Sequence, residues 1–128
     1  MALTGSFYQD GILTIRGESN ITLEDAQAIA ADINARGVIN GLPVVVLLDL
    51  SRISRVASAA HILFADMACS DKVSALVFVT RHPNTIQSVR AIVALSERGR
   101  VHFFESMREA HLFARVSAHN AQATYAIA

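Results

Sequence analysis

The chain has 128 residues, 52% of them hydrophobic, and its 11 basic side chains balance its 11 acidic ones. This length suits one domain with an apolar core, and the zero net charge argues against nucleic-acid binding, which needs a basic surface. The single cysteine, Cys69, excludes a disulfide framework and a cysteine metal cluster. No apolar run approaches the roughly 18 residues of a membrane span. We expect no secretion signal, and therefore a cytoplasmic protein of bacterial type.

The first 20 residues predict a β-hairpin. Asp10-Gly11 favours a two-residue turn, because both of its positions need a positive φ. We expect the antiparallel strands over Leu3–Gln9 and Ile12–Gly17, where strand-forming residues alternate. Thr22, which two acidic residues follow within three positions, is typical of a helix N-cap. Gly37 is expected to end that helix.

The central feature of the chain is a run of five apolar residues at positions 44–48, between Pro43 and Asp49. A continuous apolar run of this length predicts a strand buried on both faces, as in a parallel sheet. The polar and basic residues that follow, Ser51–Arg55, predict a loop. Open α/β sheets place ligands and chemistry beyond the carboxyl ends of such strands. This loop is therefore the first place to look for a function.

Helices and strands alternate after this loop. We expect, in chain order, a helix from an N-cap at Ser58 to about Ser70, a strand over 74–80, a helix capped by Asn84 or Thr85 and ending near Arg98-Gly99, a strand over Val101–Phe104, and a helix that the Ser106 and Glu109 capping box starts. Alternation of this kind implies right-handed crossovers between parallel strands. We predict an α/β fold: a single domain with a mixed, mainly parallel sheet, in which an N-terminal antiparallel β-hairpin precedes alternating helices and strands.

The last residues differ in composition from the rest. Residues 117–128 are rich in alanine and lack helical periodicity, so we assign the domain to residues 1–116 and expect the tail to fray. Order in such a tail requires something to hold it, and a partner chain is one candidate. We therefore expect a homo-oligomer, a dimer, in which the tail takes part in the contact.

The segment around the central strand resembles the STAS family (sulfate transporter and anti-sigma factor antagonist). In that family a buried strand ends in an Asp-Leu-Ser type turn, matched here by Asp49-Leu50-Ser51. A helix then begins at a small-residue segment with a regulatory serine, and the spacing to Ala57-Ser58-Ala59-Ala60 fits. The wider pattern is similar to the SpoIIAA-like branch of small bacterial proteins, through Thr22-Leu-Glu-Asp25-Ala and Phe104-Glu-Ser-Met-Arg-Glu109-Ala. The resemblance covers roughly residues 10–116 and implies the α/β fold and a regulatory role.

The helix start departs from the family pattern, which is typically Asp-Ser-Ser-Gly. A gapless overlay places Ala57 where the family has its acid and Ser58 on the first serine. Ala59 falls on the second serine, which is the phosphate acceptor in phosphorylated antagonists. The resemblance therefore does not carry over the acceptor itself.

Asp49 and Ser58 are the first candidates for a functional role. Asp49 is either a phosphate acceptor, as in receiver domains, or a turn former that bonds Ser51 or the amides beyond it. The chain lacks the acidic pair and the lysine that a receiver site needs, which favours the turn. Ser58 is either an ordinary helix cap or a phosphorylation site whose phosphate the helix N-terminus would stabilise.

Basic side chains follow both predicted central strands. Arg52 and Arg55 come after the first strand, and Arg81 and His82 after the second. Because the carboxyl ends of parallel strands meet at one edge of the sheet, these side chains form either an anion pocket with the serines of the loop or a rim of separate, solvated charges. The five dispersed histidines have no i, i+4 pair beside an acid, so we expect no metal ligands.

The sequence contains no nucleophile elbow, phosphate-binding glycine loop or dinucleotide fingerprint, so we expect no catalytic residues and no cofactor. These features favour a non-enzymatic regulatory or protein-interaction module. Its predicted working residues are Asp49, Ser51, Arg52, Arg55 and Ser58, with Arg81 and His82 as candidate anion contacts. We expect a protein partner, and the alternative is a binder of a small anionic or lipid-like molecule, by analogy with lipid-carrying relatives of the same branch.

Overall fold

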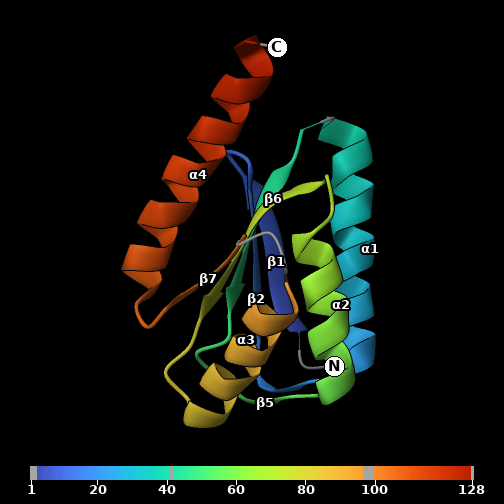
Figure 1. Ribbon diagram of the computed structural model, residues 1–128, viewed down its shortest axis with the longest axis vertical. Coiled ribbons are helices and arrows are strands. Elements are labelled where there is room, and N and C mark those ends of the chain that lie inside the picture. Colours follow the sequence, from blue (N-terminus) through green and yellow to red (C-terminus); the bar gives the residue numbers. More distant parts are fainter. Residues whose placement is uncertain (1–2, 41, 97–99, 128) are drawn as a thin grey trace.

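The computed structural model describes residues 3–40, 42–96 and 100–127, and it gives the backbone alone at residues 36–40 and 122–127. Its elements are β1 (Leu3–Gln9), β2 (Ile12–Gly17), β3 (Ser19–Ile21), α1 (Leu23–Asn40), β4 (Val44–Asp49), β5 (Ile53–Val56), α2 (Ser58–Ala68), β6 (Val73–Val79), α3 (Pro83–Leu95), β7 (Val101–Phe104) and α4 (Met107–Ile127). Figure 1 shows a central sheet with α1, α2 and α3 on one face and α4 on the other.

The main sheet has five strands in the order β1-β2-β4-β6-β7. β1 pairs antiparallel with β2, and all other neighbours are parallel. The apolar run of β4 lies at the centre, and each of its five residues is at most 1% exposed. The predicted α/β fold, with a mixed, mainly parallel sheet that begins with an antiparallel hairpin, is confirmed.

The hairpin has the bounds that its sequence predicts. Asp10 and Gly11 have φ values of 54° and 81°. Positive φ at both central positions is the requirement of the hairpin turn that Asp-Gly favours, because its twist matches that of the flanking strands. β1 thereby becomes an edge strand on the far side of β2 from the sheet centre.

Two apolar layers cover the two faces of the sheet. Val46 and Leu48 of β4 belong to the larger layer, which packs under α1, α2 and α3. Val45 and Leu47 point the other way and pack under α4 with Ala110, Ala114 and Ala118, because alternate residues of a strand face opposite sides. The alanines recur every four residues and let α4 lie close to the sheet.

The segment predicted as a loop, Ser51–Arg55, is partly a strand. β5 pairs in parallel with β3, with Ile53 opposite Ser19 and Val56 opposite Ile21. Both ends of β5 are buried, at 1% exposure for Ile53 and 5% for Val56. Burial of these two apolar residues brings the backbone beside β3, where strand pairing satisfies its polar groups. The expectation of a loop was wrong from Ile53 onward.

Helix starts agree with the sequence at two of four places. The Thr22 hydroxyl accepts a hydrogen bond from the Asp25 N–H at 3.2 Å, and the Ser106 hydroxyl accepts one from the Glu109 N–H at 3.5 Å. At α2 the N-cap is Ala57, without a side-chain bond, and Ser58 is the first helical residue. The predicted N-cap role of Ser58 was therefore wrong.

The start of α3 also differs from the prediction. Its N-cap is His82, whose Nδ1 accepts a hydrogen bond from the Asn84 N–H at 3.3 Å. Thr85 uses its hydroxyl elsewhere, as a donor to the Ile53 carbonyl. His82 takes the capping role because Pro83 holds it in an extended conformation, which suits the residue before a helix.

Helix ends were predicted less well. α1 continues through Gly37 to Asn40, since glycine inside a helix costs only about 1 kcal/mol. α3 ends at Leu95, and the residues of the predicted end, Arg98 and Gly99, lie outside the described residues. α4 continues across residue 116 to Ile127. The helix continues there because alanine is the best helix former and Ala118 extends the buried stripe of α4. The domain boundary at residue 116 and the fraying of the tail stay predictions.

Candidate functional site

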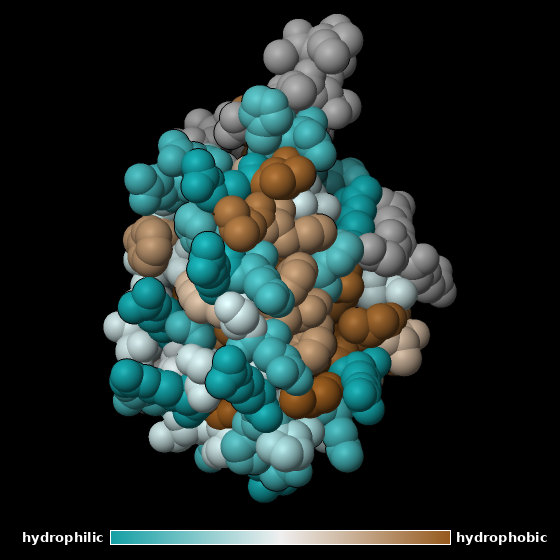
Figure 2. Space-filling model, turned by 90° about the vertical axis from the view of Figure 1, so that its left-hand side faces the viewer, coloured by the Kyte–Doolittle hydropathy of each residue, from teal (hydrophilic) through white to brown (hydrophobic). Residues whose placement is uncertain are grey.

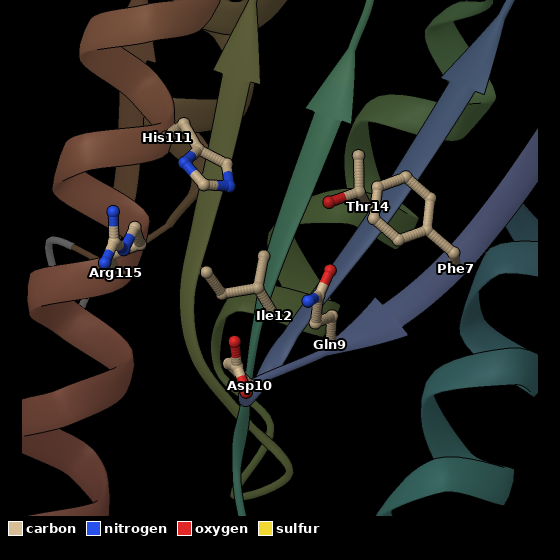
Figure 3. Close-up of a pocket in the computed structure, with 7 residues that line it drawn as sticks. All are labelled: Phe7, Gln9, Asp10, Ile12, Thr14, His111 and Arg115. Carbon is tan, nitrogen blue, oxygen red and sulfur yellow. The ribbon is translucent and has the colours of Figure 1, made fainter.

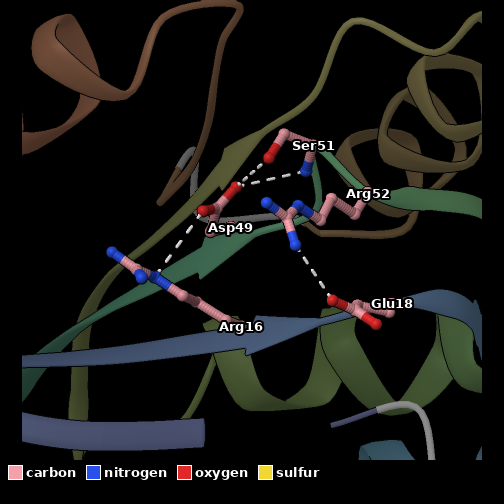
Figure 4. A network of polar contacts seen from close by, with 5 residues as sticks. All are labelled: Arg16, Glu18, Asp49, Ser51 and Arg52. Atoms are coloured by element: carbon pink, nitrogen blue, oxygen red, sulfur yellow. Dashed lines mark hydrogen bonds and ion pairs between the residues drawn. The ribbon is translucent and has the colours of Figure 1, made fainter. Parts of the chain in front are cut away.

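The candidate site begins where β4 ends. Asp49 Oδ1 accepts hydrogen bonds from the Ser51 N–H at 3.2 Å and from the Ser51 hydroxyl at 2.6 Å (Figure 4). This is an Asx-type turn, in which the carboxylate replaces a backbone acceptor two residues back. The predicted turn-forming role of Asp49 is confirmed. We call residues 49–58 the β4–α2 segment.

Charged side chains from β2 and from the residue that follows it meet this turn. Arg16 Nε lies 3.8 Å from Asp49 Oδ2, and Arg52 Nη1 lies 3.0 Å from Glu18 Oε1. The side chains of the second pair are 77% and 52% exposed, so it contributes about 0–1 kcal/mol to stability. Together these residues line an open hollow of about 330 Å³. The positive and negative groups pair with one another.

Arg16 and Glu18 were not among the predicted site residues. The parallel register between β2 and β4 places Arg16 directly opposite Asp49, and the sequence of the hairpin gives no indication of that register. β2 also carries alternating side chains, so Arg16 emerges on the same face as the turn. Only the pairing of the two strands brings these residues together.

β5 carries the segment from the turn to α2. Its two central residues, Ser54 and Arg55, are exposed, and the Ser54 hydroxyl donates to the Ser19 carbonyl at 3.1 Å. The buried Thr85 hydroxyl donates to the Ile53 carbonyl at 2.9 Å. β3 and α3 therefore hold the backbone of β5 from two sides. This fixes the position from which the Arg55 side chain extends into solvent.

A second hollow, of about 450 Å³, lies at the start of α2. Its lining is polar apart from one valine and comes from β5, α2 and α3: Arg55, Val56, Ser58, His61, Asn84, Gln87 and Ser88. Ser58 is exposed in the first turn of α2. The His61 side chain is half-buried, and its Nε2 atom is buried without a hydrogen-bond partner in the described part of the chain.

The predicted site residues of the β4–α2 segment fall into two groups, because they line two different hollows. Arg55 and Ser58 line the hollow at the start of α2, whereas Asp49, Ser51 and Arg52 line the hollow at the end of β4. His61 was not predicted, although its spacing of three from Ser58 puts both residues on one face of a helix. Asn84, Gln87 and Ser88 reach the hollow because α3 packs against β5, a contact that the sequence does not reveal.

Arg81 and His82 have local bonding partners. Arg81 Nε donates to the Glu105 carbonyl at 3.1 Å, which ties the end of β6 to the residue after β7. His82 caps α3 through its Nδ1 atom. Neither lines the two hollows at the β4–α2 segment, although both follow the neighbouring strand.

The described residues show neither a metal-binding cluster nor a membrane-spanning helix. Among them, no group of three or more His, Cys, Asp or Glu side chains is arranged to hold a metal ion. No helix in the described ranges is long and apolar enough to cross a membrane.

Comparison with solved structures supports the architecture. An anti-sigma factor antagonist from Mycobacterium paratuberculosis matches with a TM-score of 0.62 at 18% identity, over 88% of this chain and 94% of that one. The anti-sigma factor antagonist SpoIIAA in its unphosphorylated form matches with a TM-score of 0.61 at 14% identity, over 90% and 97%. An uncharacterised protein with a SpoIIAA-like fold from Shewanella loihica matches with a TM-score of 0.61 at 15% identity, over 88% and 92%.

Comparison by sequence gives no match, either to a family model or to a curated protein. Identities of 14–18% show a common fold and leave function open. The matches cover nearly the whole of each compared structure, so the similarity extends beyond a shared βαβ unit. The predicted resemblance is confirmed at this level: the chain has the SpoIIAA-like fold.

Proposed function

We propose that this chain is a non-enzymatic regulatory module that binds a protein partner through its β4–α2 segment and the hollow beside it. The observation that carries the proposal is the exposed start of α2, where Ser58 and Arg55 open onto one polar hollow. The first backbone N–H groups of a helix have no partner inside the helix. They offer donors to an acceptor on an incoming protein, next to the guanidinium of Arg55.

The surface around the start of α2 is suited to bind a polar or acidic segment of a partner protein. Arg55 forms no ion pair with any described side chain, so its charge is available for a partner carboxylate. Ala57 and Ala59 flank Ser58 with small side chains, which leaves the helix start accessible. Two of the structural matches, the mycobacterial protein and SpoIIAA, are anti-sigma factor antagonists, and this fold-level analogy raises the expectation of a protein partner.

Ser58 is the residue through which such a surface would be regulated. A phosphate on its hydroxyl would add about 1.5–2 negative charges at the N-terminus of α2, where the helix dipole favours an anion. The group would share its hollow with Arg55 and His61. It would then occupy the position that we propose for the partner's acceptor, and it would weaken the complex. Ala59 has no hydroxyl to modify, so the switch would depend on Ser58 alone.

The experiment compares one variant inside the hollow with one outside it. The partner is captured from the native cell with the tagged chain, identified by mass spectrometry and purified, and its dissociation constant is measured by calorimetry. Arg55→Glu is expected to weaken binding at least about tenfold, because it replaces an attractive charge by a repulsive one. Arg108→Glu is the control, since Arg108 is exposed on α4, on the opposite face of the sheet.

Equal affinities of Arg55→Glu and the wild-type chain would contradict the proposed surface. The same would follow if Arg108→Glu weakened the complex as much as Arg55→Glu, since the effect would then reflect overall charge. The Ser58→Glu variant, which imitates only part of a phosphate charge, is expected to weaken binding as well. The predicted dimer remains a prediction that sedimentation of the purified chain tests.

A further inference from the structure

α4 leaves part of its side of the sheet uncovered. The helix packs chiefly on β4, β6 and β7, and the β1–β2 hairpin lies beside it. A groove of about 230 Å³ runs between the helix and the hairpin (Figure 3). Figure 2 looks onto this side of the molecule and shows apolar side chains gathered among polar ones. Sites for drug-sized ligands measure roughly 300–1,000 Å³, so the groove suits a smaller molecule.

The hairpin gives the groove an apolar floor. Ile12 is 4% exposed, whereas Phe7 on the edge strand is 49% exposed. Phe7 lies opposite Thr14 in the antiparallel register, so both side chains emerge on the face that α4 leaves open. Half of the Phe7 ring is exposed to water, and burying that apolar surface is favourable. An apolar group of a bound ligand would bury it.

A polar atom without a partner lies in the same floor. Thr14 is only 3% exposed, and its hydroxyl makes no hydrogen bond to any residue of the described ranges. Figure 3 shows this hydroxyl turned toward the α4 wall of the groove. This oxygen is not among the fully buried side-chain atoms that lack a partner in the described residues, so it is accessible from the groove. A polar atom of a ligand, or a water molecule, can therefore bond it.

The two walls carry opposite charges that do not pair. Asp10 sits in the hairpin turn, where its φ of 54° is fixed by the turn, and Arg115 lies on α4, one helical turn beyond His111. Neither Asp10 nor Arg115 forms an ion pair within the part of the chain that the structure describes. Arg115 is suited to a carboxylate, and Asp10 to an ammonium group.

We propose that this groove binds a free α-amino acid with an apolar side chain. The ligand's carboxylate bonds Arg115 with support from His111, and its ammonium group bonds Asp10. Its side chain covers Phe7 and Ile12, and one of its polar atoms meets the Thr14 hydroxyl. The groove lies on the α4 face of the sheet, away from the start of α2, so this inference stands independently of the protein-binding surface.

The test uses ligands that differ by one charge. Leucine and phenylalanine are titrated into the purified full chain by calorimetry, beside 3-phenylpropionate, which lacks the ammonium group, and phenethylamine, which lacks the carboxylate. We expect measurable binding of at least one of the two amino acids. We expect the single-charge analogues to bind about tenfold to a hundredfold more weakly, since each loses one hydrogen bond to a charged group.

Two variants and a control complete the experiment. Asp10→Asn keeps a residue that tolerates the turn conformation, and Arg115→Gln keeps the helix, so both should fold. Each is expected to bind the amino acid at least about tenfold more weakly, while Arg90→Gln on α3 should bind as the wild-type chain does. The proposal is overturned if neither amino acid binds, if 3-phenylpropionate binds as tightly as phenylalanine, or if the two groove variants retain wild-type affinity.

Discussion

Thr85 provides the sharpest test of how the candidate surface is held in place. It lies in the first turn of α3, its side chain is fully buried, and its hydroxyl donates to the Ile53 carbonyl of β5 at 2.9 Å. Thr85→Val replaces the hydroxyl by a methyl group of similar volume. The variant removes the hydrogen bond between α3 and β5 and leaves the packing nearly unchanged.

The expected loss in the free energy of unfolding follows from the Ile53 carbonyl, which stays buried without its donor. A buried carbonyl that loses its partner costs about 1–3 kcal/mol, and because the substitution makes no cavity we expect about 1–2 kcal/mol. Urea unfolding of domains of this size has slopes of about 1–3 kcal/mol per molar. With a slope in the middle of that range, about 2 kcal/mol per molar, the unfolding midpoint, followed by circular dichroism, should fall by roughly 0.5–1 M, and the slope should stay unchanged.

Thr14→Val is the matched control, since Thr14 is also a buried threonine in a regular element. Its hydroxyl has no hydrogen-bond partner among the described residues, so removing it should change the free energy of unfolding by less than about 0.5 kcal/mol or increase it. If the two variants lost the same stability, or if Thr85→Val lost none, the link between α3 and β5 would not have the role assigned to it.

Three further predictions concern stability. Phe64 is fully buried and packs edge-on against Phe78, with ring centroids 5.7 Å apart, so Phe64→Ala should cost about 3–5 kcal/mol in a urea melt. Asp25 is 3% exposed and accepts two hydrogen bonds at the start of α1, and Asp25→Ala should cost about 1–2 kcal/mol. Burial lowers the pKa of His102 from its ordinary 6.5. The unfolded chain then binds the proton more readily, so stability should fall as the pH drops below about 6.5, and His102→Leu should reduce that dependence.

Much of the architecture follows from local patterns. The Asp10-Gly11 turn and the apolar run of β4 are short-range signals, since each depends on neighbouring residues and a fixed periodicity. The Thr22 cap has the same character, because its bond spans only three residues. These features appear in the structure as predicted.

The features that the sequence does not reveal depend on contacts between distant segments. Ile53 and Val56 form a strand because β3 lies alongside them. The four residues of β5 contain no local pattern that predicts this pairing. Arg16 meets Asp49 through the β2–β4 register. The end of α4 is helical because alanine propensity and the sheet contact of Ala118 outweigh the missing periodicity.

Hydrogen exchange of the chain, measured with and without the captured protein partner, shows whether the β4–α2 segment is the binding surface. We expect binding to slow exchange in residues 53–61, at β5 and the first turn of α2, because these amides become covered. Exchange in α4 should remain unchanged. Slower exchange confined to α4 or to the β1–β2 hairpin would contradict the proposed β4–α2 interaction surface.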